Sequence, residues 1–170
     1  MKTRILFAAV ALLWSSGAAF AANSQTTQFN VSSDVIANCT ISALDLNFGN
    51  YDPVVANKTA NRDVTTSVNV LCTKGASGVT VGLDLGGHGS GSSRFMLDGV
   101  SGDTLQYELY SDAARSAVWG NSGSGLVALA TFGPIGAGAG VTNTIYGRIP
   151  SGQDKSVGHY TDVVTATVNF

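Results

Sequence analysis

The sequence predicts an all-β protein with the fold of an immunoglobulin-like sandwich of two sheets. Three observations predict this class: short stretches in which apolar and polar residues alternate, clusters of Gly, Ser and Asn between those stretches, and the scarcity of helix-forming runs after residue 21. A period of two places one set of side chains toward a core and the other toward solvent, as in a half-buried strand. Short strands separated by turns favour a two-sheet sandwich.

The first 21 residues are predicted to be a signal peptide. Lys2 and Arg4 supply a positive start, and the apolar run from Ile5 to Trp14 is too short to span a bilayer. Ala19-Phe20-Ala21 then offers a small-residue cleavage site. We therefore expect an exported chain whose mature form begins near Ala22.

The mature chain is expected to form one domain at residues 34–170, after an N-terminal extension at residues 22–33, because its length suits a single core. The sequence has nine Lys and Arg against eleven Asp and Glu, and no basic cluster follows the signal peptide. This charge pattern argues against nucleic acid or anionic lipid as the main partner. No later apolar run reaches the length of a membrane span, so we do not expect an integral membrane protein.

Cys39 and Cys72 are the two cysteines of the chain. Because an exported chain enters an oxidising compartment, we expect them to form a disulfide, with a pair of buried free thiols as the alternative. Closing a loop of about 33 residues should stabilise the fold by roughly 3 to 4 kcal/mol. The two cysteines and the distant His88 and His159 lack the spacing of metal ligands, so we expect neither a metal nor a cofactor.

Alternating stretches mark the expected strands along the chain. At residues 64–72, the side chains at even positions are apolar or Thr, whereas most of those at odd positions are polar. Further strands are expected at residues 79–85, 105–109, 126–132, 141–149 and 160–170, with loops at 86–93, 120–125 and 133–140. In the last strand, four apolar side chains share one face: Val164, Ala166, Val168 and Phe170.

A period of two is also present in the N-terminal extension, although nothing in this otherwise polar segment explains it. Thr27, Phe29 and Val31 are separated by polar residues, and a second alternating stretch at 35–41 follows without a Gly or Pro turn. Without a local hairpin, the first stretch cannot fold back on the second. Its partner is therefore either a distant strand of its own domain or another molecule.

No set of titratable groups converges on a catalytic site, so we expect that the chain is not an enzyme. His88 and His159 are expected to be solvated, and Glu108, the only glutamate, is expected to face outward and be ionised. The aspartates lie near turns, where Asp commonly bonds the local backbone. The minor alternatives are a carboxylate pair for glycoside hydrolysis and a calcium site made from three aspartates: Asp98, Asp103 and Asp112.

Three stretches of the sequence also match a known family in their order along the chain. They are Cys39-Thr40-Ile41 running on to Leu46-Asn47-Phe48-Gly49-Asn50-Tyr51-Asp52-Pro53, then Leu105-Gln106-Tyr107-Glu108-Leu109-Tyr110-Ser111-Asp112 with Trp119-Gly120, then Tyr146-Gly147-Arg148-Ile149-Pro150-Ser151-Gly152-Gln153 with Gly158-His159-Tyr160-Thr161-Asp162. Together they resemble the spore coat U domain, the fold of archaic (Csu-type) chaperone-usher pilus subunits.

The resemblance implies a sandwich of six or seven strands that lacks its last strand and is completed by a donor strand. A periplasmic chaperone would fill the hydrophobic groove first, and an outer-membrane usher would then let the N-terminal strand of a neighbouring pilus subunit replace it. Thr27, Phe29 and Val31 would be the donor residues. The last strand, with its four apolar side chains pointing into the sandwich, would contact the chaperone.

The implied function is a structural subunit of a pilus, exported through the periplasm to the cell surface or secreted, that serves adhesion and biofilm formation. The family also includes secreted spore-coat and matrix proteins, which are the first alternative. A carbohydrate-binding or surface-binding secreted module and a secreted hydrolase are the others. Trp119 is expected in the core, with a place on an exposed tip loop as the alternative.

Overall fold

The computed structural model describes residues 23–128 and 140–170. Within these ranges the chain is built from β-strands and one short 3₁₀ turn, η1 (Gly123–Gly125), so the predicted all-β class is confirmed. The chain divides into two units, Met1–Asp34 and Val35–Phe170. The predicted signal peptide lies outside the described residues.

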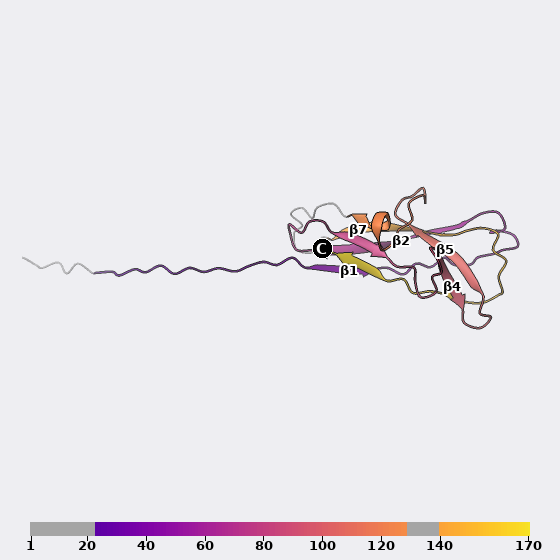
Figure 1. The fold of residues 1–170 in the computed structure, drawn as a ribbon, viewed down its shortest axis with the longest axis horizontal. Coiled ribbons are helices and arrows are strands. Elements are labelled where there is room, and N and C mark those ends of the chain that lie inside the picture. The colour runs from indigo at the N-terminus through magenta and orange to yellow at the C-terminus, as the bar shows by residue number, and fades with distance from the viewer. Residues whose placement is uncertain (1–22, 129–139) are drawn as a thin grey trace, which may run out of the picture. The chain divides into compact units, whose positions relative to one another are not determined.

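The strands of the second unit form two antiparallel sheets (Figure 1). The larger sheet has the order β1-β2-β7-β5-β4-β8, and the smaller one has the order β6-β3-β9. The strands are β1 (Cys39–Ala43), β2 (Arg62–Cys72), β3 (Thr80–Leu83), β4 (Arg94–Asp98), β5 (Thr104–Tyr110), β6 (Val127–Ala128), β7 (Val141–Ile149), β8 (Tyr160–Thr161) and β9 (Ala166–Asn169).

Most predicted strands are present, and two of them differ from the prediction. The strand expected at 160–170 is divided into β8 and β9, because the chain passes there from the larger sheet to the smaller one. The stretch at 35–41 becomes a strand only from Cys39 onward. Of the strand expected at 126–132 and the loop at 133–140, residues 129–139 lie outside the described residues.

Strand β4 was not predicted from the sequence. Its Arg94 and Asp98 are buried, whereas the residues between them are half-buried. A strand that directs charged side chains inward does not show the apolar alternation used to recognise the others. Its pairing with β5, from Arg94 opposite Tyr107 to Leu97 opposite Thr104, extends the larger sheet.

Side chains from both sheets fill one core. The buried apolar residues are Phe48, Val68, Val70, Cys72, Ala76, Val79, Val81, Leu83, Leu105, Tyr107, Leu109, Trp119, Ile145 and Ile149. Trp119 is in the core, as expected, and its indole Nε1 donates a hydrogen bond of 2.9 Å to the Val81 carbonyl. Cys39 and Cys72 lie opposite each other on β1 and β2 and form the predicted disulfide.

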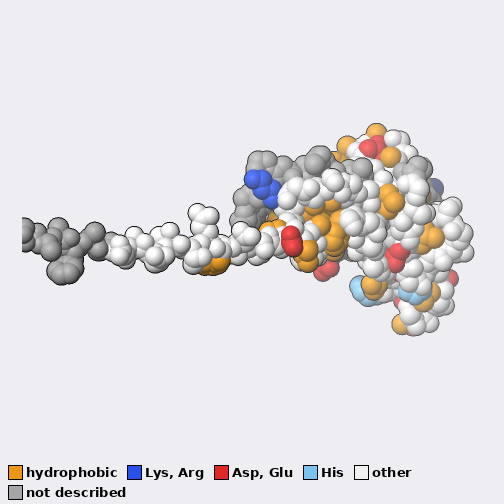
Figure 2. Space-filling view, turned by 60° about the vertical axis from the view of Figure 1, so that its left-hand side comes forward, with side chains coloured by type: hydrophobic (Ala, Val, Ile, Leu, Met, Phe, Trp, Pro, Cys, Tyr) orange, Lys and Arg blue, Asp and Glu red, His pale blue; other side chains and the backbone are white. Residues whose placement is uncertain are grey.

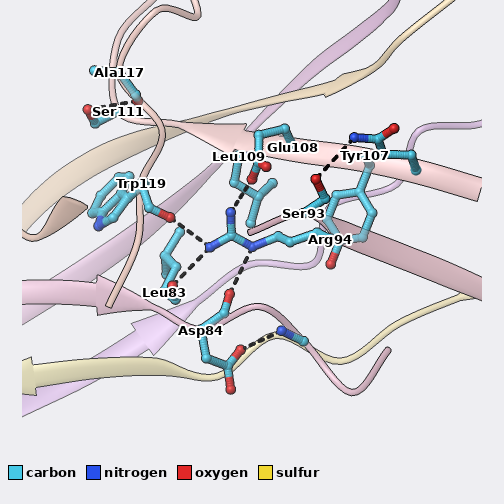
Figure 3. Close-up of polar contacts among 12 residues, drawn as sticks. Leu83, Asp84, Ser93, Arg94, Tyr107, Glu108, Leu109, Ser111, Ala117 and Trp119 are labelled. Atoms are coloured by element: carbon cyan, nitrogen blue, oxygen red, sulfur yellow. Dashed lines mark hydrogen bonds and ion pairs between the residues drawn. The ribbon is translucent and has the colours of Figure 1, made fainter. Parts of the chain in front are cut away.

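A buried cation joins the two sheets near one margin of this core (Figure 3). The guanidinium of Arg94 donates from Nε to the Asp84 carbonyl at 2.8 Å, and from Nη2 to the carbonyls of Leu83 and Trp119 at 2.9 and 2.7 Å. Its Nη1 pairs with Glu108 Oε1. The prediction that Glu108 faces outward is wrong, because the fully buried Arg94 requires a counter-charge and the Glu108 side chain, only 12% exposed, supplies it.

Replacing Glu108 with Ala is expected to destabilise the fold strongly, because it leaves the buried Arg94 without its carboxylate. We expect the free energy of unfolding in urea to fall by about 3 to 5 kcal/mol. The control is Asp63→Ala, which removes a carboxylate paired with Arg148 at 2.7 and 2.8 Å near the surface. That change should cost about 1 kcal/mol or less. Equal losses in the two variants would contradict the assigned role of Arg94.

Candidate functional site

The sandwich is open along one seam. Strand β1 is an edge of the larger sheet and β9 is an edge of the smaller one. They approach each other to within 8 Å between Cα atoms, but no ladder joins them in the part of the chain that the structure describes. Edge strands carry unpaired backbone N–H and C=O groups, so a seam of this kind can accept a further strand.

The seam widens into a groove of about 950 Å³. The first wall is residues 43–51, which follow β1, and the second wall is residues 155–166, which run through β8 into β9. Core side chains form the floor: Leu83, Met96, Leu105, Tyr107, Leu109, Ile145 and Ile149. Because core side chains form this floor, the groove opens onto the hydrophobic core. On the face drawn in Figure 2, hydrophobic side chains reach the surface in one larger group and in several smaller spots.

The first wall is held against β7 by a close approach at a glycine. Phe48 is buried, and its ring meets that of Tyr107 edge-on with centroids 6.0 Å apart. A Cβ on Gly147 would lie 2.7 Å from Leu46 Cδ2 and 3.0 Å from Phe48 Cζ. A side chain at position 147 would therefore push the Leu46 and Phe48 side chains away from the sheet.

The second wall and β9, into which it runs, carry three of the four apolar side chains that the sequence assigned to the last strand. Val164, Ala166 and Val168 are half-buried and pack against the core. Phe170 is 57% exposed instead, because it lies beyond Asn169, the last residue of β9 to pair with β3.

Hydrogen bonds from the Asp84 side chain and backbone fix the start of β9. The Asp84 N–H donates to the Thr165 carbonyl at 3.0 Å, and Asp84 Oδ1 accepts from the N–H groups of Thr165 at 2.8 Å and Gly86 at 3.0 Å. Partial burial disfavours the charged carboxylate, but these backbone donors outweigh it and hold the pKa of Asp84 below its ordinary value of 3.8. The ionised form of Asp84 thus stabilises the wall.

The residues of the N-terminal extension remain exposed. Residues 23–38 form no regular secondary structure, and Thr27 is exposed. The side chains of Phe29 and Val31 are 83% and 84% exposed. Large apolar side chains that alternate along an exposed polar segment are typical of a surface that is covered in an assembled state.

The other polar residues singled out in the sequence have structural partners. His88 is not merely solvated, because its Nδ1 lies 3.0 Å from Asp162 Oδ1, whereas His159 is exposed. Asp98 accepts from Ser101, and Asp112 accepts from the N–H groups of Ser116 and Ala117, in the turn role expected for Asp.

Asp103, the third residue of the calcium alternative, accepts from the Ser156 N–H at 3.0 Å. No group of three metal-ligating side chains gathers anywhere in residues 23–128 and 140–170. Within the same ranges, no helix is long and apolar enough to cross a membrane.

Known proteins are similar to this chain in sequence and in fold. A family model described as Spore Coat Protein U domain matches residues 25–167. Protein U of Myxococcus xanthus is 41% identical over 133 residues, which cover 74% of this chain and 71% of that protein. A solved chaperone–tip adhesion subunit pre-assembly complex, CsuC–CsuE from the archaic chaperone-usher Csu pili of Acinetobacter baumannii, is similar in fold, with a TM-score of 0.56 and 23% identity.

The match to the CsuC–CsuE structure covers 80% of this chain but only 40% of the solved chain. At this level of identity the likeness concerns the fold alone. It agrees with the immunoglobulin-like sandwich predicted from the alternating strands, and that prediction is confirmed.

Acid is expected to loosen the junction between β3 and β9. Because the folded-state pKa of Asp84 is lowered, its contribution to stability is fully present above about pH 4 and is lost as the pH falls through the folded-state pKa. Asp84→Asn keeps an oxygen acceptor but cannot titrate. We expect its thermal midpoint, followed by circular dichroism, to fall less steeply than that of the unchanged protein between about pH 5 and pH 2.

The control for this measurement is Asp154→Asn, which changes an exposed carboxylate. Its melting curves should follow those of the unchanged protein at every pH. If Asp84→Asn also gave a parallel pH profile, the Asp84 carboxylate would not stabilise the wall.

Proposed function

This chain belongs to the spore coat protein U family, and on that basis we propose that it is a structural subunit of a surface fibre of the pilus type. In the proposed fibre, the N-terminal extension of one subunit adds a strand to the groove of its neighbour. The observation that carries the proposal is the groove itself, a 950 Å³ opening between the segments next to two edge strands, with a floor of core side chains.

The extension has the side chains that such a groove requires. Thr27, Phe29 and Val31 would point toward the floor, and the polar residues between them would face solvent. Burying Phe29 and Val31 would contribute about 1.5 to 3 kcal/mol each. The backbone of the added strand would form hydrogen bonds with both walls. Joined subunits would then behave as one completed domain, whose unfolding is needed to break the contact.

Strand addition requires the seam to open at its narrow end. Neighbouring strands in a sheet are about 4.8 Å apart, so a strand inserted between two others separates them by about 9.6 Å. Strands β1 and β9 approach to within 8 Å. An incoming strand would therefore enter at the wide part of the groove, between the walls at residues 43–51 and 155–166, and separate β1 from β9 as it advances.

The proposed assembly partners would act at this same groove. A periplasmic chaperone would occupy it before assembly and would pair with β9, which carries Ala166 and Val168, and with the segment at Val164 just before it. The solved relative in fold is a complex of a chaperone with a tip adhesion subunit, which supports a partner of this kind. Delivery by an outer-membrane usher, export to the cell surface, and a role in adhesion and biofilm formation are parts of the same proposal.

A secreted spore-coat protein is the second candidate function. The observation in its favour is the 41% identity to Protein U, which extends over most of both chains. A coat protein of this fold could close its groove with its own extension or with a partner's. Linear polymers that resist SDS would favour the fibre subunit, whereas a monomer with a closed groove would favour the coat protein.

The donor role of Phe29 predicts that Phe29→Asp abolishes assembly without unfolding the subunit. A carboxylate cannot enter the apolar groove of the neighbour without a large desolvation penalty. We expect a chaperone-bound subunit with an unchanged thermal midpoint, but no ladder of polymers in SDS gels of unheated samples.

The control is Asn30→Asp, which places the same charge on the opposite face of the same strand. That variant should polymerise normally. Intact polymers from Phe29→Asp would exclude the donor-strand function. A subunit that unfolds would instead place Phe29 in the core of its own domain, where a buried charge costs several kcal/mol, on the order of 3 or more.

Removal of β9 is expected to prevent chaperone capture. Truncation after Thr165 deletes the strand that pairs with β3 and the proposed pairing edge for the chaperone. We expect the truncated subunit to be degraded in the periplasm and absent from the purified chaperone. Truncation after Asn169 removes only the exposed Phe170 and should leave capture intact. Co-purification of the shorter protein at the normal ratio would exclude this role of β9.

A further inference from the structure

Between β8 and β9, side chains largely hold the second wall of the groove in place. In this stretch no backbone hydrogen bond of Val163 or Val164 to a described residue is present, and Thr165 bonds only to Asp84. Among the described residues, the backbone of Val163 and Val164 therefore has no partner and can pair with an added strand. An extended segment without a ladder needs another restraint to keep its conformation.

Asp162 supplies a restraint from two directions. Its side chain is only 2% exposed. Its Oδ2 accepts a hydrogen bond of 2.7 Å from the hydroxyl of Tyr107 on β5, and its Oδ1 lies 3.0 Å from His88 Nδ1 in the loop between β3 and β4. One carboxylate thus connects the wall to an element of the larger sheet and to a loop that leaves the smaller one.

The loop that follows β3 is shaped around this carboxylate. Gly86 has a φ of +78°, and a Cβ at that position would lie 1.9 Å from Asp162 Oδ2. Any other residue at 86 would displace the carboxylate. Burial, with the hydrogen bond to Asp162, raises the pKa of Tyr107, so the phenol remains protonated and donates a hydrogen bond to Asp162.

We propose that Asp162 is a positioning residue of the groove: it holds the wall at Val163 and Val164 in the extended conformation that an incoming strand requires. The proposal rests on the proposed function, in which this wall pairs with a donor strand. A partner binds faster to an edge that is already ordered, because less conformational entropy is lost on binding. Once the donor strand has bound, its backbone hydrogen bonds keep the wall in its extended conformation. The contacts of Asp162 then matter less for keeping the strand bound.

The loss of Asp162 should therefore slow capture of a strand more than it speeds release. The test uses the full exported chain carrying Phe29→Asp, which disables its own extension, as the acceptor. The probe is a fluorescent peptide with the sequence of residues 23–38, and a peptide with Phe29→Asp is the negative control. Stopped-flow mixing gives the association rate constant, and displacement by unlabelled peptide gives the dissociation rate constant.

Three further changes are compared in this acceptor. Asp162→Ala removes both contacts, and we expect the association rate constant to fall at least about tenfold while the dissociation rate constant changes less than about threefold. Asp162→Asn keeps an acceptor for Tyr107 and offers a donor to His88, so it should restore the rate to within about threefold. Asp112→Ala is the matched control, because its carboxylate binds backbone N–H groups in a loop that does not line the groove.

Tyr107→Phe provides a second route if Asp162→Ala does not fold, because it removes only the hydroxyl that donates to Asp162. It should slow capture in the same direction, and amide exchange at Val163 and Val164 should be faster than in Asp112→Ala. If the parent acceptor captures the peptide but these variants are no slower than Asp112→Ala, the role of Asp162 is excluded and the fibre function stands. If the parent acceptor captures no peptide, the fibre function itself is excluded.

Discussion

The structure depends on one unpaired seam, because β1 ends the larger sheet, β9 ends the smaller one, and no ladder joins them among the described residues. A closed sandwich would cover Leu105, Tyr107 and Ile145 with a strand along this side, whereas here these side chains form the floor of a groove. These three side chains are only 4 to 5% exposed, so the seam is left open mainly at the unpaired backbone groups of its two edges. The same arrangement makes strand addition favourable.

Buried and half-buried polar groups hold one wall of the groove in place. Arg94 donates to the Asp84 carbonyl, Asp84 accepts from the Thr165 N–H, and Thr165 leads into β9. This chain of contacts links a cation in the core, drawn with Asp84 in Figure 3, to one wall of the groove. Asp162 adds a second link to the same wall. Networks of this kind are stabilising only when every member is satisfied, which accounts for the close fit around each carboxylate.

The motifs that identify the family have physical roles around the groove. Beyond the end of β7, the Gln153 side-chain amide bonds to the Gln106 backbone as a neighbouring strand would. It accepts from the Gln106 N–H at 2.8 Å and donates to the Gln106 carbonyl at 2.9 Å. Tyr51 donates to the Pro150 carbonyl at 2.9 Å and accepts from the Gln153 N–H at 3.0 Å, so it joins the end of the first wall to the same turn. Resemblance to a family could locate these residues but not their contacts.

The sequence by itself determined the strand class, most strand positions and the pairing of Cys39 with Cys72, because alternation and cysteine content are local or compositional properties. Only the tertiary structure decided that β4 directs Arg94 inward onto Glu108, that Phe170 lies beyond the last pair of β9, and that Asp162 meets His88 and Tyr107. His88 and Tyr107 are 74 and 55 positions from Asp162 along the chain. Contacts of that separation depend on how the sheets pack, and no periodic pattern in the sequence records them.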